Sequence, residues 1–296
     1  MNVKKIALIN DLSGFGKCSL TAAIPVISVM GVQACPLPTA ILSAQTGFDS
    51  YFYDDYTRNM NSISDKWAGM GVAFDGICSG YLGSARQIEN LLYFLEKFQT
   101  KDNIFLADPV MGDHGKCIKS FSPKLLQTMK VLTQKADVIT PNLTELCLLG
   151  DVDYAELLGY SHKKDYPDRI IQVAGQLLSG SKRLKTIIIT GIVRTKDDGR
   201  YIGNLIVTDT DSLYFESPYN GESFSGTGDL FAAVVIGNLV KGRSAGEAVQ
   251  RAMDFLQPAI EDASREDIPR EHGVNFEKYL TRLTKEELPC QTEKRA

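Results

Sequence analysis

Residues 5–37 read KIALINDLSGFGKCSLTAAIPVISVMGVQACPL, and this stretch decides the fold class. Its apolar segments at 5–10 and 32–37 are short, whereas the segment at 19–30 between them is long enough for a helix. We therefore predict a strand, a helix and a second strand. Two strands joined by a helix form a βαβ unit, in which the strands lie parallel in one sheet.

The same alternation continues along the chain. Six further short segments have strand character, at 76–79, 104–107, 138–140, 185–190, 203–208 and 212–216. Longer segments with helical character lie at 54–69, 84–99, 122–134, 142–149, 167–179, 229–241, 244–261 and 274–287. The last two strands are joined by only three residues and are predicted to form an antiparallel hairpin. The pattern predicts an α/β fold, a three-layer α/β/α sandwich whose central, mostly parallel sheet has helices on both faces.

The length and composition fit one globular domain. With 296 residues, of which 44% are apolar, the chain can build a large core. The only linker-like segment, 160–168, is too short to separate two domains, so we predict a single domain over 1–296. A net charge of −4 argues against nucleic acid as a partner. Neither a signal peptide nor an apolar run of the roughly 20 residues that span a membrane is evident, so we expect a cytoplasmic protein.

Cysteine and histidine residues are too scattered to suggest a zinc site. The six cysteines include no CxxC pair, and the three histidines lie far apart in the sequence. We expect reduced, mostly buried thiols. Any metal must then bind through carboxylates, which favours Mg²⁺.

A glycine-rich turn, GFGKCS at 14–19, follows the first predicted strand. A dinucleotide-binding fingerprint would have Gly or Ala where Ser19 stands, with an acidic residue at the end of the second strand. A GxxxxGK[ST] phosphate loop would need Gly in place of Asp11, and Ser or Thr in place of Cys18. We interpret the turn instead as a close approach of the backbone to a ligand or a neighbouring strand, on the substrate side of a site.

The strongest chemical signal is FSGTGD at 224–229, which leads into an apolar helix. Gly226 and Gly228 let several backbone N–H groups point to one place at the helix N-terminus, where anions are stabilised. A phosphoryl group in transfer is such an anion. Asp229, in the first turn of the helix, can accept the proton of an attacking hydroxyl group. An ordinary glycine turn with an aspartate as helix cap has the same pattern.

Two more acidic motifs follow predicted strands. In TPNLTE, Asn142 and Glu145 fit a helix cap, but they also suit a phosphate contact and Mg²⁺ held through water. In DPVMGD, Asp108 and Asp113 fit either a turn or a Mg²⁺ site. Ligands of α/β sheets bind beyond the carboxyl ends of the strands, where all these motifs are expected. Their coincidence favours a kinase that uses Mg·ATP.

The combination of NLTE at 142–145 with GTGD at 226–229 resembles the ribokinase superfamily. Four motifs are similar to its pyridoxal/pyridoxamine kinase family: DPVMGD at 108–113, GDLFAA at 228–233, SAQTG at 43–47 and SGYL at 79–82. The resemblance covers about residues 5 to 260. It implies an ATP-dependent transferase that phosphorylates the 5′-hydroxymethyl group of a vitamin B6 vitamer. Such enzymes use Mg²⁺, are often activated by K⁺ and are typically homodimers.

The resemblance also implies roles for the matching residues. The expected catalytic residues are Asp229 as the base, with Gly226, Thr227 and Gly228 as the anion hole. The residues expected to organise the metal and the nucleotide are Glu145 and Asp108 as metal ligands, with Asp113, Asn142 and Thr190. The residues expected to line the vitamer pocket are Asp11, Thr46 and Tyr81, the last near the pyridine ring.

Two residues depart from the family pattern. Many pyridoxal kinases carry Ser where this chain has Asp11, and His where it has Gln45. An aspartate against the ring would favour a protonated pyridinium, or a vitamer that bears an amine, through charge pairing.

Two other functions stay open. A hydroxymethylpyrimidine kinase of the same superfamily also phosphorylates a hydroxymethyl group on a heteroaromatic ring, but it usually carries Cys where Asp229 stands. A non-catalytic nucleotide-binding protein could share the fold, because fold alone does not fix function. The presence of Asp229 and Glu145 argues against this second alternative.

Overall fold

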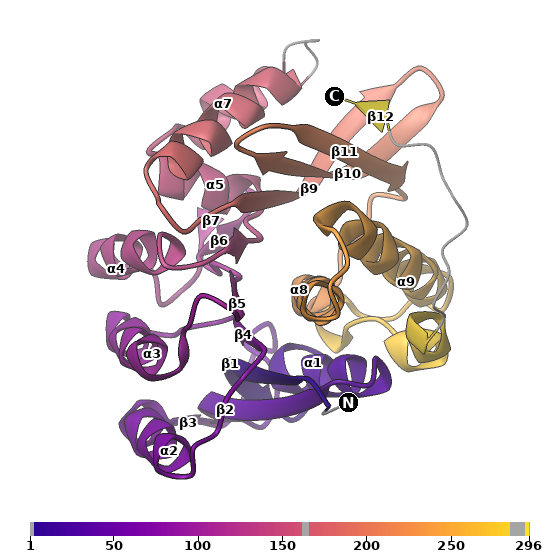
Figure 1. The fold of residues 1–296 in the computed structure, drawn as a ribbon. Coiled ribbons are helices and arrows are strands. Elements are labelled where there is room, and N and C mark those ends of the chain that lie inside the picture. The colour runs from indigo at the N-terminus through magenta and orange to yellow at the C-terminus, as the bar shows by residue number, and fades with distance from the viewer. Residues whose placement is uncertain (1–2, 162–165, 285–293, 296) are drawn as a thin grey trace. The chain divides into compact units, whose positions relative to one another are not determined.

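The structure is a computed structural model that describes residues 3–161, 166–284 and 294–295. The described chain forms two compact units, whose helices and strands are labelled in Figure 1. Unit 1 contains residues 3–106 and 222–284, and unit 2 contains the described residues of 107–221 together with 294–295. Each unit combines strands and helices, so the predicted α/β class is confirmed.

The sheet of unit 1 is built around β1 (Lys5–Ser13). Its parallel neighbours are β2 (Gln33–Leu42) and β4 (Gly76–Ser79). β5 (Ile104–Ala107) lies beside β4, and the short β3 (Tyr53–Asp55) pairs antiparallel with β2 at the other edge. Side chains of β1 are buried on both faces of the sheet, as expected for a strand between two helix layers.

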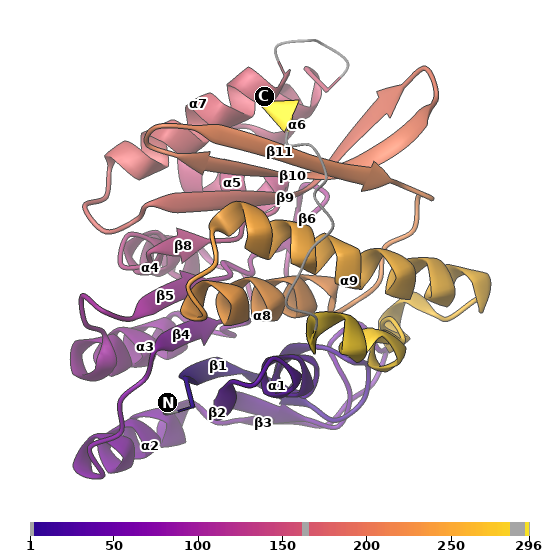
Figure 2. The same ribbon diagram turned by 45° about the vertical axis from the view of Figure 1, so that its right-hand side comes forward.

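Helices cover both faces of this sheet (Figures 1 and 2). One face carries α2 (Thr57–Gly69) and α3 (Ala85–Phe98), and the other carries α1 (Ser19–Val29), α8 (Thr227–Val240) and α9 (Ala245–Arg265). α8 packs against both α1 and α9, which explains why it is apolar around most of its circumference. The chain then continues through two 3₁₀ helices, η1 (Arg270–His272) and η2 (Phe276–Thr284). Unit 1 thus has the predicted three layers.

Unit 2 combines one parallel strand pair with an antiparallel extension. β8 (Val138–Ile139) runs parallel to β9 (Thr186–Lys196), and the order continues through β10 (Gly199–Thr208), β11 (Ser212–Pro218) and β12 (Lys294–Arg295). The predicted hairpin is confirmed as β10 and β11. The helices of the unit are α4 (Pro123–Thr133), α5 (Leu143–Gly150), α6 (Tyr154–Leu158) and α7 (Tyr166–Ser179). A second, two-stranded sheet pairs β6 (Gly112–Asp113) with β7 (Lys116–Cys117).

Several sequence predictions need correction. The segment predicted as a helix at 54–69 begins only at Thr57, because Tyr53–Asp55 pairs with β2 as an exposed edge strand. The last predicted helix is a 3₁₀ helix over Phe276–Thr284, and residues 285–287 lie outside the described residues. The elements that sequence reasoning missed are β3, β6, β7, α6, η1 and β12. All are very short, so hydrophobic periodicity has too few residues to mark them.

The cysteine prediction holds only in part. Cys18 and Cys147 are buried, but Cys117 is exposed and two others are half-buried, while Cys290 lies outside the described residues. Residues 162–165 of the linker-like segment are also outside them. Within the described ranges, no helix combines the length and the apolar character that a membrane crossing requires.

Candidate active site

The polar end of β1 is the centre of the candidate site in unit 1. The parallel register between β1 and β2 shifts between Asn10 and Leu12. Such an irregularity re-aims side chains at the end of a strand. Asn10 and Asp11 are only 7% and 5% exposed, although both are polar. Buried polar groups require hydrogen-bond partners, and both residues have them.

Two serine hydroxyl groups hold the Asp11 carboxylate. Ser13 Oγ donates to one carboxylate oxygen at 2.6 Å, and Ser19 Oγ donates to the other at 2.7 Å. Burial raises the pKa of Asp11, and these two hydrogen bonds oppose the rise. Asp11 therefore lies at a site where a cationic group would be stabilised.

Asp229, the predicted base, lies in the first turn of α8, as expected. Asn10 Nδ2 donates to its Oδ1 at 2.8 Å, and the backbone N–H of Ser19 also donates to its carboxylate. Burial raises the pKa of Asp229 to about 6, and the nearby Asp11 charge adds to the rise. A carboxylate with a pKa in this range suits proton transfer near neutral pH.

The predicted anion hole is the N-terminal turn of α8. Gly226 is the N-cap residue, with a left-handed φ of +80°. Among the described residues, no side chain caps this helix end, so its first N–H groups are available to an anion. The Thr227 hydroxyl donates to the Phe224 carbonyl at 3.0 Å, so only the backbone N–H of Thr227 is left for an anion. Gly228 is exposed.

Tyr81 lies next to β1, and Tyr53, which sequence reasoning missed, lies close to it. The Tyr81 backbone N–H donates to Asn10 Oδ1 at 2.8 Å. A methyl group on Gly83 would lie 3.3 Å from the Tyr81 hydroxyl and 3.2 Å from that of Tyr53, so these hydroxyls lie close together. Burial, helped by Tyr81 and nearby carboxylates including Asp11, raises the pKa of Tyr53 to about 12. Tyr53 therefore lies among the candidate site residues near Asp11 and Tyr81. Its place on an exposed edge strand gave no signal in the sequence.

Gln45 connects the predicted pocket loop to two other segments of unit 1. Its Nε2 donates to Ser225 Oγ at 3.2 Å and to the Glu271 carbonyl at 3.0 Å. Its Oε1 accepts a hydrogen bond from the Gly47 N–H at 2.7 Å. Thr46, between Gln45 and Gly47, is exposed, and its predicted contact with a vitamer remains a prediction.

The predicted glycine turn borders a pocket of about 510 Å³ in unit 1. The backbone of this turn is unusual, because Gly16, Lys17 and Ser19 all have positive φ, at 109°, 49° and 52°. Left-handed residues of this kind concentrate at functional sites. The other wall of the pocket comes from the segment around η1 and η2. The residues that line this pocket do not include Asp11 or Asp229, both of which are described. The pocket therefore lies beside these two carboxylates and does not contain them.

In unit 2, Asn142 and Glu145 form the capping box at the start of α5. Glu145 accepts hydrogen bonds from the backbone N–H groups of Asn142 at 2.9 Å and Met111 at 3.1 Å. The Asn142 side chain accepts from the Glu145 N–H at 3.0 Å and donates to the Gly112 carbonyl at 2.8 Å. The cap therefore also holds the DPVMGD loop against α5.

Buried Glu145 and half-buried Asp108 form an acidic pair. Glu145 is 4% exposed, and burial together with the Asp108 charge raises its pKa well above the ordinary value. A divalent cation would relieve the repulsion between these carboxylates. Mg²⁺ usually binds one or two protein carboxylates and completes its shell with water and phosphate oxygens, so this donor set fits Mg²⁺.

Asp113, the third predicted acidic residue, is separate from this pair. It is exposed, and its carboxylate lies 3.5 Å from the side chain of His114. Within the described ranges, no three His, Cys, Asp or Glu side chains gather as metal ligands. The pair of Asp108 and Glu145 is therefore the candidate metal site, without Asp113.

Thr190 lies beside Asn142, and the predicted contact of both residues with a nucleotide stays a prediction. The two residues form an isolated parallel β-bridge, and the Thr190 N–H donates to the Pro141 carbonyl at 2.9 Å. Sequence reasoning missed Thr144, whose Oγ1 accepts a hydrogen bond from the Gly115 N–H at 2.9 Å. Thr144 thus ties the loop after Asp113 to α5.

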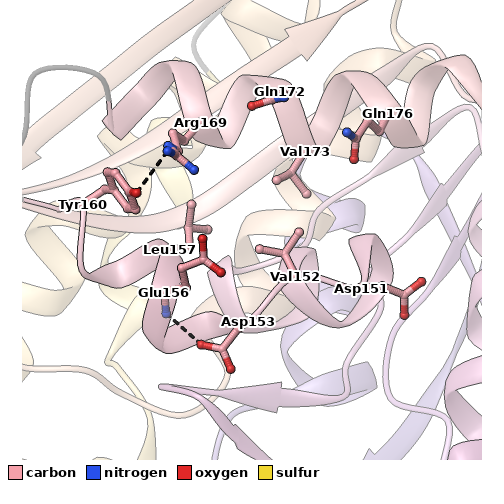
Figure 3. A pocket seen from close by; sticks show the side chains of 10 residues that line it. All are labelled: Asp151, Val152, Asp153, Glu156, Leu157, Tyr160, Arg169, Gln172, Val173 and Gln176. Atoms are coloured by element: carbon pink, nitrogen blue, oxygen red, sulfur yellow. Dashed lines mark hydrogen bonds between the residues drawn. The ribbon is translucent and has the colours of Figure 1, made fainter.

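A second pocket, of about 280 Å³, lies in unit 2 between the end of α5, α6 and α7 (Figure 3). The Arg169 guanidinium stacks on the Tyr160 ring at 3.9 Å from its centroid and donates to its hydroxyl at 3.0 Å. The predicted site residues, all of which are described, do not line this pocket. It is therefore not the candidate active site.

The chain is similar to kinases of known family and structure. Residues 16–274 match the family described as phosphomethylpyrimidine kinase. The chain is 28% identical over 273 residues to pyridoxal kinase PdxY of Aliivibrio fischeri, which covers 88% of this chain and 89% of that protein. It is 34% identical to a phosphomethylpyrimidine kinase homologue of Bacteroides thetaiotaomicron, with a TM-score of 0.89 over 99% of this chain and 97% of that one.

Two further structures extend the likeness. An orthorhombic crystal form of the Bacteroides thetaiotaomicron protein, which contains pyridoxal, is 35% identical, with a TM-score of 0.86 over 98% of each chain. Pyridoxal kinase from Lactobacillus plantarum is 26% identical, with a TM-score of 0.83 over 95% of this chain and 97% of that one.

Proposed function

This chain belongs to the phosphomethylpyrimidine kinase family, and we propose that it transfers the γ-phosphoryl group of ATP to the 5′-hydroxymethyl group of a vitamin B6 vitamer. The observation that carries the proposal is the half-buried Asp229 carboxylate at the start of α8, with its raised pKa and its hydrogen bond from Asn10. The relatives named pyridoxal kinase, and the homologue whose structure contains pyridoxal, support the choice of acceptor.

The acceptor half of the reaction is assigned to unit 1. Asp229 accepts the proton of the vitamer hydroxyl as its oxygen attacks the γ-phosphorus, and the bond from phosphorus to the leaving ADP oxygen breaks. The N–H groups of Gly226, Thr227 and Gly228 stabilise the negative charge on the transferring group. Asp11, Thr46 and Tyr81 are assigned to the vitamer.

The nucleotide half is assigned to unit 2. Asp108 and Glu145 would hold Mg²⁺, which neutralises charge on the phosphate oxygens when it is bound. Asn142 and Thr190 are assigned to the nucleotide, and Asp113 to the phosphates. We propose that residues 1–296 form a single kinase domain that includes both units. Activation by K⁺, a homodimeric state and a cytoplasmic location complete the proposal, on the strength of the resemblance.

A hydroxymethylpyrimidine kinase is the alternative, and the description of the matching family favours it. Both acceptors carry a hydroxymethyl group on a heteroaromatic ring. The residue at the base position, Asp229, favours the vitamer, because hydroxymethylpyrimidine kinases usually carry Cys there.

A coupled ADP-release assay with Mg·ATP tests the proposal. Pyridoxal, pyridoxine, pyridoxamine and hydroxymethylpyrimidine are offered separately, to the wild type and to Asp229→Ala. Turnover of a vitamer that falls by a factor of about 10² to 10⁴ in the variant is the expected result. Turnover of the pyrimidine alone would transfer the chain to the alternative, and the lack of turnover with all four would overturn both assignments.

A further inference from the structure

Asn10 has no part in the mechanism above, yet its side chain contacts the expected base. Its Nδ2 donates to Oδ1 of Asp229 at 2.8 Å, although the two residues are 219 positions apart in the chain. Asn10 is 7% exposed, so little water competes for this hydrogen bond. A buried amide group that meets a carboxylate in this way makes a charge-assisted hydrogen bond, which is among the stronger kinds.

The backbone fixes the orientation of the Asn10 side chain. Its Oδ1 accepts hydrogen bonds from the backbone N–H groups of Asp11 at 3.0 Å and Tyr81 at 2.8 Å. Both neighbours are donors, so they can be paired only with the amide oxygen. The amide NH₂ must therefore point the other way, toward Asp229.

Gly80 provides the space that this arrangement needs. A Cβ atom at this position would lie 2.2 Å from Nδ2 of Asn10 and 2.6 Å from its Cγ. Any other residue at position 80 would displace the amide group from Asp229. The loop that carries Tyr81 thus both orients Asn10 and leaves room for it.

We propose that Asn10 is a positioning residue for Asp229, which holds the carboxylate in one orientation and stabilises its ionised form for proton acceptance. A donor to a carboxylate favours the charged form, which is the form that a base requires. The role of Asp229 as a base rests on the proposed function. The hydrogen bond from Asn10 to Asp229 does not depend on which substrate is bound.

The other groups around Asp229 act in both directions. Burial and the Asp11 carboxylate raise its pKa, whereas the Ser19 N–H and Asn10 lower it. The Cys18 thiol also lies near the two carboxylates, and burial together with their charges raises its pKa to about 12, so it is neutral at physiological pH. Asn10 and Ser19 are thus the groups that oppose protonation of the base.

The test is a titration of the Asp229 carboxyl group by ¹³C NMR in aspartate-labelled protein, with Asp229→Asn to assign the signal. We expect a midpoint near 6 in the wild type and a midpoint at least half a pH unit higher in Asn10→Ala. Asn10→Asp keeps an acceptor for the backbone N–H groups of Asp11 and Tyr81, and it adds a further carboxylate beside Asp229. It should therefore fold and raise the Asp229 midpoint further.

Asn103→Asp is the matched control. Asn103 is also in unit 1 and 5% exposed, its Nδ2 donates to the carbonyls of Phe74 and Phe98, and its Oδ1 accepts from the Thr100 N–H. This variant has the same buried substitution without contact to Asp229, so it should leave the midpoint unchanged.

The pH dependence of kinase activity provides the second measurement. In both Asn10 variants the acidic limb of kcat should move to higher pH by the amount seen in the titration, while KM for the vitamer stays within about threefold. A wild type that phosphorylates no vitamer would overturn the proposed function, and the titration would still decide the role of Asn10. Equal midpoints in the wild type and Asn10→Ala would show that Asn10 does not act on Asp229.

Discussion

A methyl group at Gly226 would stand 2.2 Å from the carbonyl oxygen of Lys17. The glycine turn after β1 and the glycine loop before α8 are therefore in direct backbone contact. Gly273 fits against the same place, where an added Cβ would lie 2.9 Å from the Gly16 carbonyl oxygen and 3.2 Å from that of Ser225. Glycine at positions 226 and 273 is what allows these three segments to meet.

We predict that Gly226→Ala disrupts the anion hole. The new methyl group must displace backbone atoms, and alanine is strained at a φ of +80°. The free energy of unfolding should fall by about 2 to 4 kcal/mol, and kcat/KM by about 100-fold or more. Chemical denaturation and the ADP-release assay measure the two effects.

Gly242→Ala is the control for this prediction. Gly242 has a φ of +85°, but no atom lies within 4 Å of its added Cβ among those described. It should lose only about 1 to 2 kcal/mol of stability and retain its activity. Comparable losses of activity in both variants would show that the contact with Lys17 is not what matters.

Asp229→Asn should make the protein more stable at neutral pH while it removes activity. Burial raises the Asp229 pKa from its ordinary value of 3.8 to about 6, so the folded protein binds this proton more tightly than the unfolded chain. Stability is therefore lost as the pH rises from about 4 through 6. The variant avoids this loss and should gain roughly 1 to 2 kcal/mol at pH 7, and nothing at pH 3.5.

Denaturation at both pH values checks the gain. Asp102→Asn, which replaces an exposed carboxyl group in the same unit, should leave stability unchanged at either pH. A variant of Asp229 that is destabilised at pH 7 would mean that its hydrogen bonds to Asn10 and Ser19 outweigh the cost of burying its charge.

Local features of the chain were predictable from the sequence. The βαβ unit at 5–37 follows from the alternation of short and long apolar segments. The start of α8 follows from GTGD, and the capping box at Asn142 follows from the Glu three residues later. Each of these depends on residues that are near one another in the chain.

Contacts between distant residues were not predictable in the same way. Nothing next to Asn10 or Ser19 in the sequence shows that they contact Asp229, because the sheet and α8 bring these residues together only in the folded unit. Tyr53 directly precedes the segment 54–69 that the sequence predicts as a helix, because YDD lacks the alternation of a buried strand. The separation of Asp113 from Glu145 also depends on the course of a loop, which residue types do not specify.

The charge of Asp11 should determine the choice among vitamers. If Asp11 pairs with a cationic amine or pyridinium, Asp11→Ser should lower kcat/KM for pyridoxamine relative to pyridoxal by about tenfold. Asp11→Asn removes the charge but keeps an acceptor for one of the two serine hydroxyls. The same change of preference in both variants would assign it to the charge, and an unchanged preference would exclude this role for Asp11.

Glu145 should influence the Mg²⁺ requirement beyond its part in the helix cap. Glu145→Gln removes one carboxylate of the acidic pair with Asp108, so the Mg²⁺ concentration for half-maximal activity should rise about tenfold or more. Glu247→Gln is the matched control, because Glu247 completes an exposed capping box with Ser244 at the start of α9. Both variants weaken a cap, but only Glu145→Gln should change the Mg²⁺ titration. An equal Mg²⁺ requirement in both would leave Glu145 with the helix cap as its only role.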